Sequence, residues 1–414
     1  MPVGLACLAA VSLAHATCPA GADIVAKPTL ELLPPTGKFA IGRTSFHWID
    51  PSRAQPDVAK REILAHVWYP AKPNTDAATV PYLPDFKALR AAVGEAELKG
   101  TAGPAYEALS KARTHAVADA ELCLKLDKYP VVLLTHGLRY SALGYSILAE
   151  ELASHGYVVV GVDHPATAFA MILPGDRTVI FDEKLWSQRR SADDLRTFER
   201  TKVQECAEDL VFALNQLEPL NRGTPEERFT GRLDLARVGI VGHSFGGRVA
   251  ARACQIDARL LACVLLDSFG RKMNVETNAD GSTLLQPTMI QYARRVPKSG
   301  VGRALALLQN GGKDLEDELH PIRKEFCQSV KADSYELTLH LAGVSHETFS
   351  DIPLLESGQT EAMLKSRRHA MQLVRDYTRA FLNRHVNGSE APLLDHPAAK
   401  PDEVELTRYT FRGE

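Results

Sequence analysis

Residues 237–247 read Arg237-Val238-Gly239-Ile240-Val241-Gly242-His243-Ser244-Phe245-Gly246-Gly247. The apolar run before the turn predicts a buried strand, and apolar residues recur at helical spacing after it. A Gly-x-Ser-x-Gly turn between a strand and a helix is typical of a nucleophile elbow. Such a turn forces Ser244 into a cramped backbone conformation and lifts its hydroxyl above the sheet, at the N-terminus of the helix. We therefore predict a nucleophilic Ser244; the alternative is a glycine-rich turn without chemistry.

The composition indicates a globular protein. The chain has 414 residues, of which 45% are hydrophobic and 24% charged, and this suits one large domain or two smaller ones. A formal net charge of −3 gives no indication of a nucleic acid partner. No uncharged apolar run is long enough to predict a transmembrane segment.

The N-terminus has a different character. Residues 5–14 are mostly apolar, and Ala14-His15-Ala16 resembles a small-x-small cleavage site, although no basic residue precedes it. We predict that residues 1–16 are a signal peptide and that the protein is periplasmic or secreted. Without cleavage of this segment, a cytoplasmic location is expected.

The cysteines and histidines show no ligand spacing. The chain contains neither a Cys-x-x-Cys pair nor paired histidines at helical spacing, so we predict no metal and no other cofactor. Cys254 and Cys263 fall in a predicted core helix and a predicted core strand, where a buried free thiol is the expected state.

From residue 130 onward, predicted strands and helices alternate. Strands are expected at residues 131–135, 157–162, 237–241, 260–266, 288–292 and 335–341, after two outer strands at 39–49 and 63–69. Helices are expected at residues 143–152 and 192–217 and around 370–381. This rhythm predicts an α/β fold with a mainly parallel central sheet and helices on both faces.

The remaining segments complete a single predicted domain, residues 17–414. Residues 81–128 are predicted to be a helical insertion that flanks the site. Residues 295–332 form a longer, largely helical segment, and the Pro-rich tail after residue 387 is expected to be irregular.

A nucleophilic serine needs a base, and the base needs an orienting acid. In α/β-hydrolases these partners follow in the order Ser, Asp or Glu, His. Asp267 directly follows the strand 260–266, at the edge where an open parallel sheet carries its functional groups. His346 lies in the loop after the last predicted strand. We predict a Ser244–Asp267–His346 triad.

Each partner has an alternative. Asp267 could be a plain strand-end cap, and Glu347 and Asp351 are other acids near the predicted base. His340, inside the last predicted strand, is the alternative base. His243 neighbours the nucleophile, but we expect it to point away and to serve packing.

An oxyanion needs two backbone donors, and the second comes from the loop after an earlier central strand. His136-Gly137-Leu138 occupies that loop, and Gly137 allows a close backbone approach. We predict that the N–H groups of Leu138 and Phe245 form the oxyanion hole. The alternative is that His136-Gly137 merely makes a turn.

These residues resemble the platelet-activating factor acetylhydrolases of the plasma and type II intracellular kind. The similar segments lie in consistent order between residues 130 and 350: Thr135-His136-Gly137-Leu138, Leu152-Ala153-Ser154-His155-Gly156-Tyr157, Val162-Asp163-His164, Gly242-His243-Ser244-Phe245-Gly246-Gly247, Leu265-Leu266-Asp267, Gln286-Pro287 and Ser345-His346-Glu347-Thr348-Phe349.

The resemblance implies an α/β-hydrolase fold, the same triad with donors at Leu138 and Phe245, and hydrolysis of short acyl esters such as the sn-2 acetyl group of an ether phospholipid. A small ester or phospholipid is the implied substrate, with transient contact to a lipid surface. Residues 288–335 are longer than the family pattern, and the apolar run 301–308 could line the acyl pocket, touch lipid or pack in the core. The alternative functions are a serine peptidase or acyltransferase, a dienelactone- or polyester-type esterase, and a binding protein without activity.

Overall fold

A computed structural model of the chain describes residues 31–53, 60–74, 76–94, 109–268, 283–294, 315–354, 359–397 and 402–411. The predicted signal peptide and the apolar run 301–308 lie outside the described residues. In the described part of the chain, no helix is long and apolar enough to cross a lipid bilayer.

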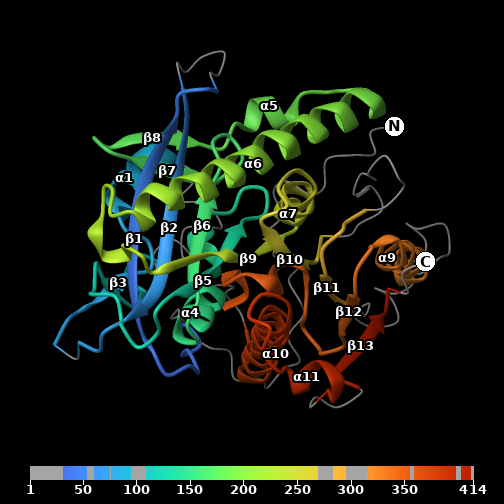
Figure 1. Cartoon of the computed structure of the whole chain (residues 1–414). Helices are drawn as coiled ribbons and strands as arrows, with labels where there is room; N and C mark the ends of the chain where they lie inside the picture. The colour runs from blue at the N-terminus through green and yellow to red at the C-terminus, as the bar shows by residue number, and fades with distance from the viewer. Residues whose placement is uncertain are drawn as a thin grey trace.

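The described residues form one large sheet and a separate hairpin (Figure 1). The strand order in the large sheet is β13-β12-β11-β10-β9-β5-β6-β2-β1-β4-β3. The strands are β1 (Ala40–Asp50), β2 (Arg61–Ala71), β3 (Thr79–Pro81), β4 (Arg113–Ala118), β5 (Tyr129–Thr135), β6 (Val158–Asp163), β9 (Leu233–His243), β10 (Leu260–Leu266), β11 (Thr288–Ala293), β12 (Ser334–Leu339) and β13 (Val404–Tyr409), and the hairpin pairs β7 (Ala170–Leu173) with β8 (Arg177–Ile180). From β6 through β5, β9, β10 and β11 to β12 all neighbours are parallel. The α/β fold with a mainly parallel sheet is therefore confirmed.

Helices cover both faces of the sheet (Figure 1). They are α1 (Phe86–Val93), α4 (Ser146–Ser154), α5 (Glu183–Ser187), α6 (Ala192–Asn221), α7 (Phe245–Ile256), α9 (Leu315–Ser329), α10 (Glu361–His385) and α11 (Pro392–Asp395), with 3₁₀ helices η1 (Ala142–Tyr145), η2 (Glu227–Phe229), η3 (His346–Phe349) and η4 (Ile352–Leu354).

The continuous apolar strands follow from this two-sided cover. Successive strand residues point to opposite faces, so a strand buried on both faces has no polar alternation. Val131 and Leu133 of β5 join a core with α6, α7 and α9. Val132 and Leu134 join a second core with α4, α10 and α11. Each buried face is thus sealed by its own layer of helices.

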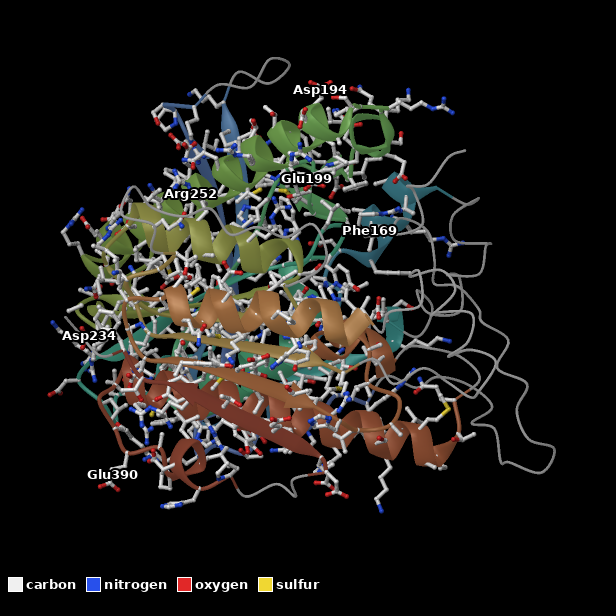
Figure 2. The ribbon with its side chains drawn as sticks, turned by 90° about the vertical axis from the view of Figure 1, so that its right-hand side faces the viewer. Phe169, Asp194, Glu199, Asp234, Arg252 and Glu390 are labelled. Atoms are coloured by element: carbon white, nitrogen blue, oxygen red, sulfur yellow. The ribbon has the colours of Figure 1, made fainter. Side chains whose placement is uncertain are left out.

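Polar contacts tie α6 to α7 on one of these faces. Figure 2 labels Asp194 and Glu199 on α6 and Arg252 on α7, and the two helices lie on the same side of the sheet. The Arg248 guanidinium donates to the Glu199 carboxylate at 3.0 Å, and Arg252 donates to Gln204 at 2.6 Å. Helix α7, which follows the predicted nucleophile, is therefore held against the long helix α6 by these hydrogen bonds.

The chain ends differ from the expectation. The tail after residue 387 is not irregular, because it contains α11 and the edge strand β13, which pairs antiparallel with β12. Within residues 81–128, the structure shows helix α1 and also strand β4, which pairs with β1. Of residues 295–332, the described part forms α9 up to Ser329.

Candidate active site

The elbow predicted from the sequence is present between β9 and α7. Ser244 has φ 55° and ψ −120°, a conformation that costs a non-glycine residue on the order of 1–3 kcal/mol. A Cβ on Gly242 would lie 2.2 Å from the carbonyl oxygen of Gly246. A Cβ on Gly246 would lie 2.5 Å from the carbonyl oxygens of Thr135 and His136. Only glycine lets the turn close this tightly.

The structure brings Ser244, Asp267 and His346 together. His346 Nδ1 lies 2.5 Å from Asp267 Oδ2, and His346 Nε2 lies 2.7 Å from Ser244 Oγ. Because an ionised carboxylate only accepts hydrogen bonds, Nδ1 carries the proton and Nε2 faces the serine hydroxyl as an acceptor. Asp267 is 8% exposed, while the His346 side chain is 30% exposed. In this arrangement the partly exposed imidazole of His346 can accept the hydroxyl proton of Ser244.

Asp267 is placed by the sheet itself. It follows β10 directly, has φ 43°, and donates its backbone N–H to Gln291 of β11 at 2.7 Å. His346 begins η3, the short helix after β12. Both positions are at the carboxyl end of parallel strands, where an open α/β sheet forms its ligand sites.

The two predicted oxyanion donors belong to segments that meet at Ser244. Phe245 is the first residue of α7, so its N–H lies in the first helical turn. Leu138 follows Gly137 in the loop after β5. A Cβ on Gly137 would lie 3.3 Å from Ser244 Cβ, which shows how closely this loop approaches the nucleophile.

The alternative site residues lie in other contacts. His340 Nε2 is 3.5 Å from a carboxylate oxygen of Glu405 on the edge strand β13. Asp351 accepts a hydrogen bond from the hydroxyl of Tyr82 at 2.9 Å. Asp267, and neither Asp351 nor Glu347, accepts from His346 Nδ1.

Tyr145 and His243, which no sequence motif assigns to the site, lie against it. The hydroxyl of Tyr145 is 2.8 Å from His243 Nδ1, and His243 Nε2 is 2.9 Å from the His346 carbonyl oxygen. His243 is indeed buried, but it makes hydrogen bonds as well as packing contacts. No motif indicates Tyr145, because its contact with His243 joins residues that are 98 positions apart in the sequence.

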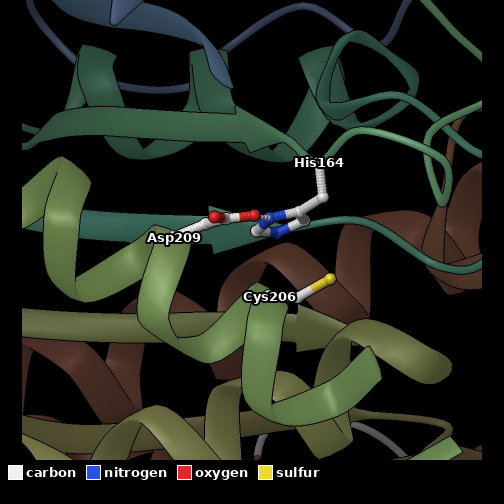
Figure 3. A group of neighbouring side chains, drawn as sticks. All are labelled: His164, Cys206 and Asp209. Carbon is white, nitrogen blue, oxygen red and sulfur yellow. Dashed lines mark hydrogen bonds and ion pairs between the residues drawn. The ribbon is translucent and has the colours of Figure 1, made fainter. Parts of the chain in front are cut away.

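One buried group of potential metal ligands occurs among the described residues, formed by His164, Cys206 and Asp209 (Figure 3). His164 Nδ1 lies 2.9 Å from Asp209 Oδ2. The Arg61 guanidinium donates to both Asp209 oxygens, at 2.9 and 2.7 Å. Burial raises the pKa of the Cys206 thiol to about 12, away from the thiolate that a metal prefers. The positive charge that Asp209 needs is supplied by arginine, so this donor set does not fit a metal.

The Arg61–Asp209 pair is expected to matter for stability. Burial alone would raise the pKa of Asp209, but the charge of Arg61 and hydrogen bonds from His164 and Arg61 hold it well below its ordinary value. We predict that Arg61→Met lowers the free energy of unfolding by about 3–5 kcal/mol, because it leaves a buried carboxylate without its main partner. Urea unfolding measures the loss. Arg177→Met, which breaks the exposed pair with Glu62, is the matched control and should change little; equal losses in both variants would contradict the prediction.

Asp351 gives a pH-dependent expectation. Burial raises the pKa of its carboxyl well above the ordinary value, and nearby Glu150 adds to this, against hydrogen bonds from Tyr82 and the Ile147 N–H. The folded state therefore holds a proton that the unfolded chain releases above its ordinary pKa near 3.9. The stability contributed by this proton is present below that value and is lost as the pH rises toward the folded-state pKa.

We predict that Asp351→Asn, which cannot ionise, becomes more stable relative to the native protein as the pH rises from 5 to 8. Urea unfolding at both pH values measures the difference. Asp351→Ala, which removes the acceptor for Tyr82, should be less stable at both pH values. A stability difference between the native protein and Asp351→Asn that stays constant from pH 5 to pH 8 would show that the carboxylate is already ionised in the fold at pH 5.

Comparisons with known proteins show the family of this chain. The family model described as "Platelet-activating factor acetylhydrolase, isoform II" matches residues 29–391. Among curated proteins, the platelet-activating factor acetylhydrolase of Cavia porcellus is 30% identical over 34% of this chain and 35% of its own length. The enzyme of the same name from Canis lupus familiaris is 27% identical over 34% of this chain and 36% of its own length. The chain thus matches about a third of the length of these relatives.

Two similarities extend over nearly the whole chain. A probable 1-alkyl-2-acetylglycerophosphocholine esterase of Arthroderma benhamiae is 24% identical over 91% of this chain and 94% of its own length. The solved structure of a ferulic acid esterase from Streptomyces cinnamoneus superimposes with a TM-score of 0.68 at 26% identity, over 92% of this chain and 99% of that one. Because the family model spans most of the residues, including every strand from β1 to β12, this chain belongs to the platelet-activating factor acetylhydrolase isoform II family.

Proposed function

We propose that this protein is a serine esterase that hydrolyses short-chain acyl esters through Ser244, His346 and Asp267. The observation that carries the proposal is the pair of His346 contacts, 2.7 Å to the Ser244 hydroxyl and 2.5 Å to the Asp267 carboxylate. His346 bridges a serine in a strained backbone conformation and a nearly buried acid, an arrangement that a solvated surface histidine does not need. The family membership supports the same chemistry.

The reaction follows from these contacts. His346 Nε2 takes the hydroxyl proton as Ser244 Oγ attacks the ester carbonyl, and the Asp267 carboxylate stabilises the imidazolium that forms. The N–H groups of Leu138 and Phe245 would hold the oxyanion, aided by the positive end of the α7 dipole. His346 then protonates the leaving alcohol. A water molecule, deprotonated by the same imidazole, attacks the acyl-enzyme and releases the acid.

The substrate class that the comparisons favour is an ester with a short acyl group, including the sn-2 acetyl group of an ether phospholipid. The family description and the fungal relative's name both refer to this ester. A second candidate is an ester of an aromatic acid, because one solved structure that superimposes over 92% of this chain is a ferulic acid esterase. Both candidates use the same acyl transfer and differ in the acid that is released.

An ester panel separates these candidates. Acetyl, butyryl, octanoyl and feruloyl esters of one alcohol should show the highest kcat/KM for the acetyl ester, and an acetylated ether phospholipid should be hydrolysed as well. A matched acetyl amide and an added acceptor alcohol test for a peptidase or an acyltransferase. A preference for the feruloyl ester would favour the second candidate, and preferential amide cleavage would contradict an esterase.

We predict that Ser244→Ala lowers kcat for p-nitrophenyl acetate by about 10⁴-fold or more, since the variant has no nucleophile to form an acyl-enzyme. A fluorophosphonate probe should label the native protein and not the variant. Ser366→Ala is the control, because the Ser366 hydroxyl donates to the Ala342 carbonyl on an exposed part of the surface. Unchanged turnover by Ser244→Ala would refute the assignment, and a native protein that neither turns over nor reacts with the probe would indicate a binding protein.

A further inference from the structure

A chain of buried hydrogen bonds runs beneath the candidate active site. The Gly137 N–H donates to the hydroxyl oxygen of Tyr145 at 2.9 Å. That hydroxyl lies 2.8 Å from His243 Nδ1, and His243 Nε2 lies 2.9 Å from the carbonyl oxygen of His346. These hydrogen bonds therefore link the proposed oxyanion loop, the residue before the proposed nucleophile and the backbone of the proposed base.

The chemistry of these groups allows one direction for the chain. A carbonyl oxygen only accepts, so His243 Nε2 must carry a proton and donate it to His346. Nδ1 of a neutral imidazole is then an acceptor, and the Tyr145 hydroxyl must donate to it. The Tyr145 oxygen is left free to accept from the Gly137 N–H. Every donor meets an acceptor with no group left over.

Burial keeps both side chains in the protonation states that this direction requires. His243 and Tyr145 are each 1% exposed. Burial, and after it the charge of neighbouring His346, lowers the pKa of His243 to about 3, so its ring stays neutral. Burial raises the pKa of Tyr145 well above its ordinary value, so the hydroxyl keeps its proton.

Aromatic contacts restrict the His243 ring further. The rings of Tyr140 and Tyr145 meet it edge-on, each with centroids 5.7 Å away. Phe349, at the end of η3, stacks on it at 6.1 Å. The ring therefore contacts both η1, which follows the oxyanion loop, and η3, which begins with His346.

We infer that Tyr145 and His243 are positioning residues that hold the His346 backbone and the Gly137–Leu138 loop in register with Ser244. The inference rests on the proposed esterase function for its kinetic consequence, while the placement of His346 is a property of the fold. Neither residue is assigned contact with the substrate. Loss of these hydrogen bonds should therefore lower kcat and leave KM nearly unchanged, since a misplaced base slows the chemical step.

The test compares three substitutions. His243→Leu removes both hydrogen bonds and should lower kcat by about 10²-fold, the effect typical of a small misplacement of a catalytic group. His243→Gln offers an amide oxygen to Tyr145 and an amide N–H to the His346 carbonyl, so it should recover most of the activity. Tyr145→Phe removes a single oxygen and should act in the same direction as His243→Leu. The Tyr145→Phe/His243→Leu double variant should lose less than the product of the two single losses, because both act through one network.

A spectroscopic readout separates positioning from a general structural role. The proton on His346 Nδ1 lies in a 2.5 Å hydrogen bond to Asp267, so its resonance in a histidine-labelled sample should be shifted far downfield. We expect this resonance in the native protein and in His243→Gln, and its broadening or upfield movement in His243→Leu and Tyr145→Phe.

Matched controls are available elsewhere in the fold. Tyr409→Phe removes a hydroxyl that donates to Glu336 at 2.9 Å on the sheet edge. His385→Leu removes a partly buried histidine at the end of α10. Both should leave kcat and the downfield resonance unchanged.

The inference is overturned if folded His243→Leu or Tyr145→Phe keeps the native kcat and resonance, or if His243→Gln is as impaired as His243→Leu. If His243→Leu does not fold, Tyr145→Phe and His243→Gln still decide. If the native protein proves inactive on every ester, the proposed function fails, and the resonance alone decides whether the network positions His346.

Discussion

The candidate site depends on the close contact that the first turn of α7 makes with the strand ends beneath it. The first turn of α7 presents glycines at this contact, since a Cβ on Gly246 would lie 2.5 Å from the carbonyl oxygens of Thr135 and His136. A Cβ on Gly247 would lie 1.6 Å from Ser268 Oγ, beyond the end of β10. Three segments therefore lie in close contact: the loop after β5, the turn after β9 and the segment after β10. The proposed oxyanion loop, nucleophile and acid then lie within reach of each other.

The sheet bears the strain that this convergence creates. Ser244 and Asp267 both have positive φ, which non-glycine residues adopt at a cost. Each is held by a backbone hydrogen bond to the next strand, Ser244 to the Leu266 carbonyl at 2.9 Å and Asp267 to the Gln291 carbonyl at 2.7 Å. The strands beneath are buried on both faces, so they cannot shift to relax the turn without exposing one of two cores. The strain is thus local, and the opposing stabilisation is spread over the fold.

The same physics explains which parts of the protein could be predicted from the sequence. Strand β10 matches its predicted bounds because a strand buried on both faces is a continuous apolar run, whose ends are marked by the first polar residues on either side. The positions of Asp267 and His346 beside Ser244 could be predicted because parallel strands end at a common edge. Strand β13 was not predicted, because a short half-exposed strand far from its partner in sequence looks like a tail. Tyr145 carries no motif, and its role depends on distances that only the packed fold defines.

Two histidines with neighbouring rings differ in their environment: His243 is buried in the hydrogen-bond network beneath the site, and His346 is the proposed base. The rings of His243 and His346 lie with centroids 4.7 Å apart. His243 is fully enclosed, and burial lowers its pKa to about 3, whereas the His346 side chain is 30% exposed and borders an acid. A second charge beside a transient imidazolium would oppose its formation, so a neutral His243 favours the proposed chemistry. This burial lowers the stability of the fold in acid. Below the ordinary histidine pKa near 6.5, His243 binds a proton in the unfolded chain but not in the folded protein. Burial likewise lowers the pKa of His136 and His385 to about 4, so the three histidines together make the fold less stable as the pH falls from 6.5 toward 4.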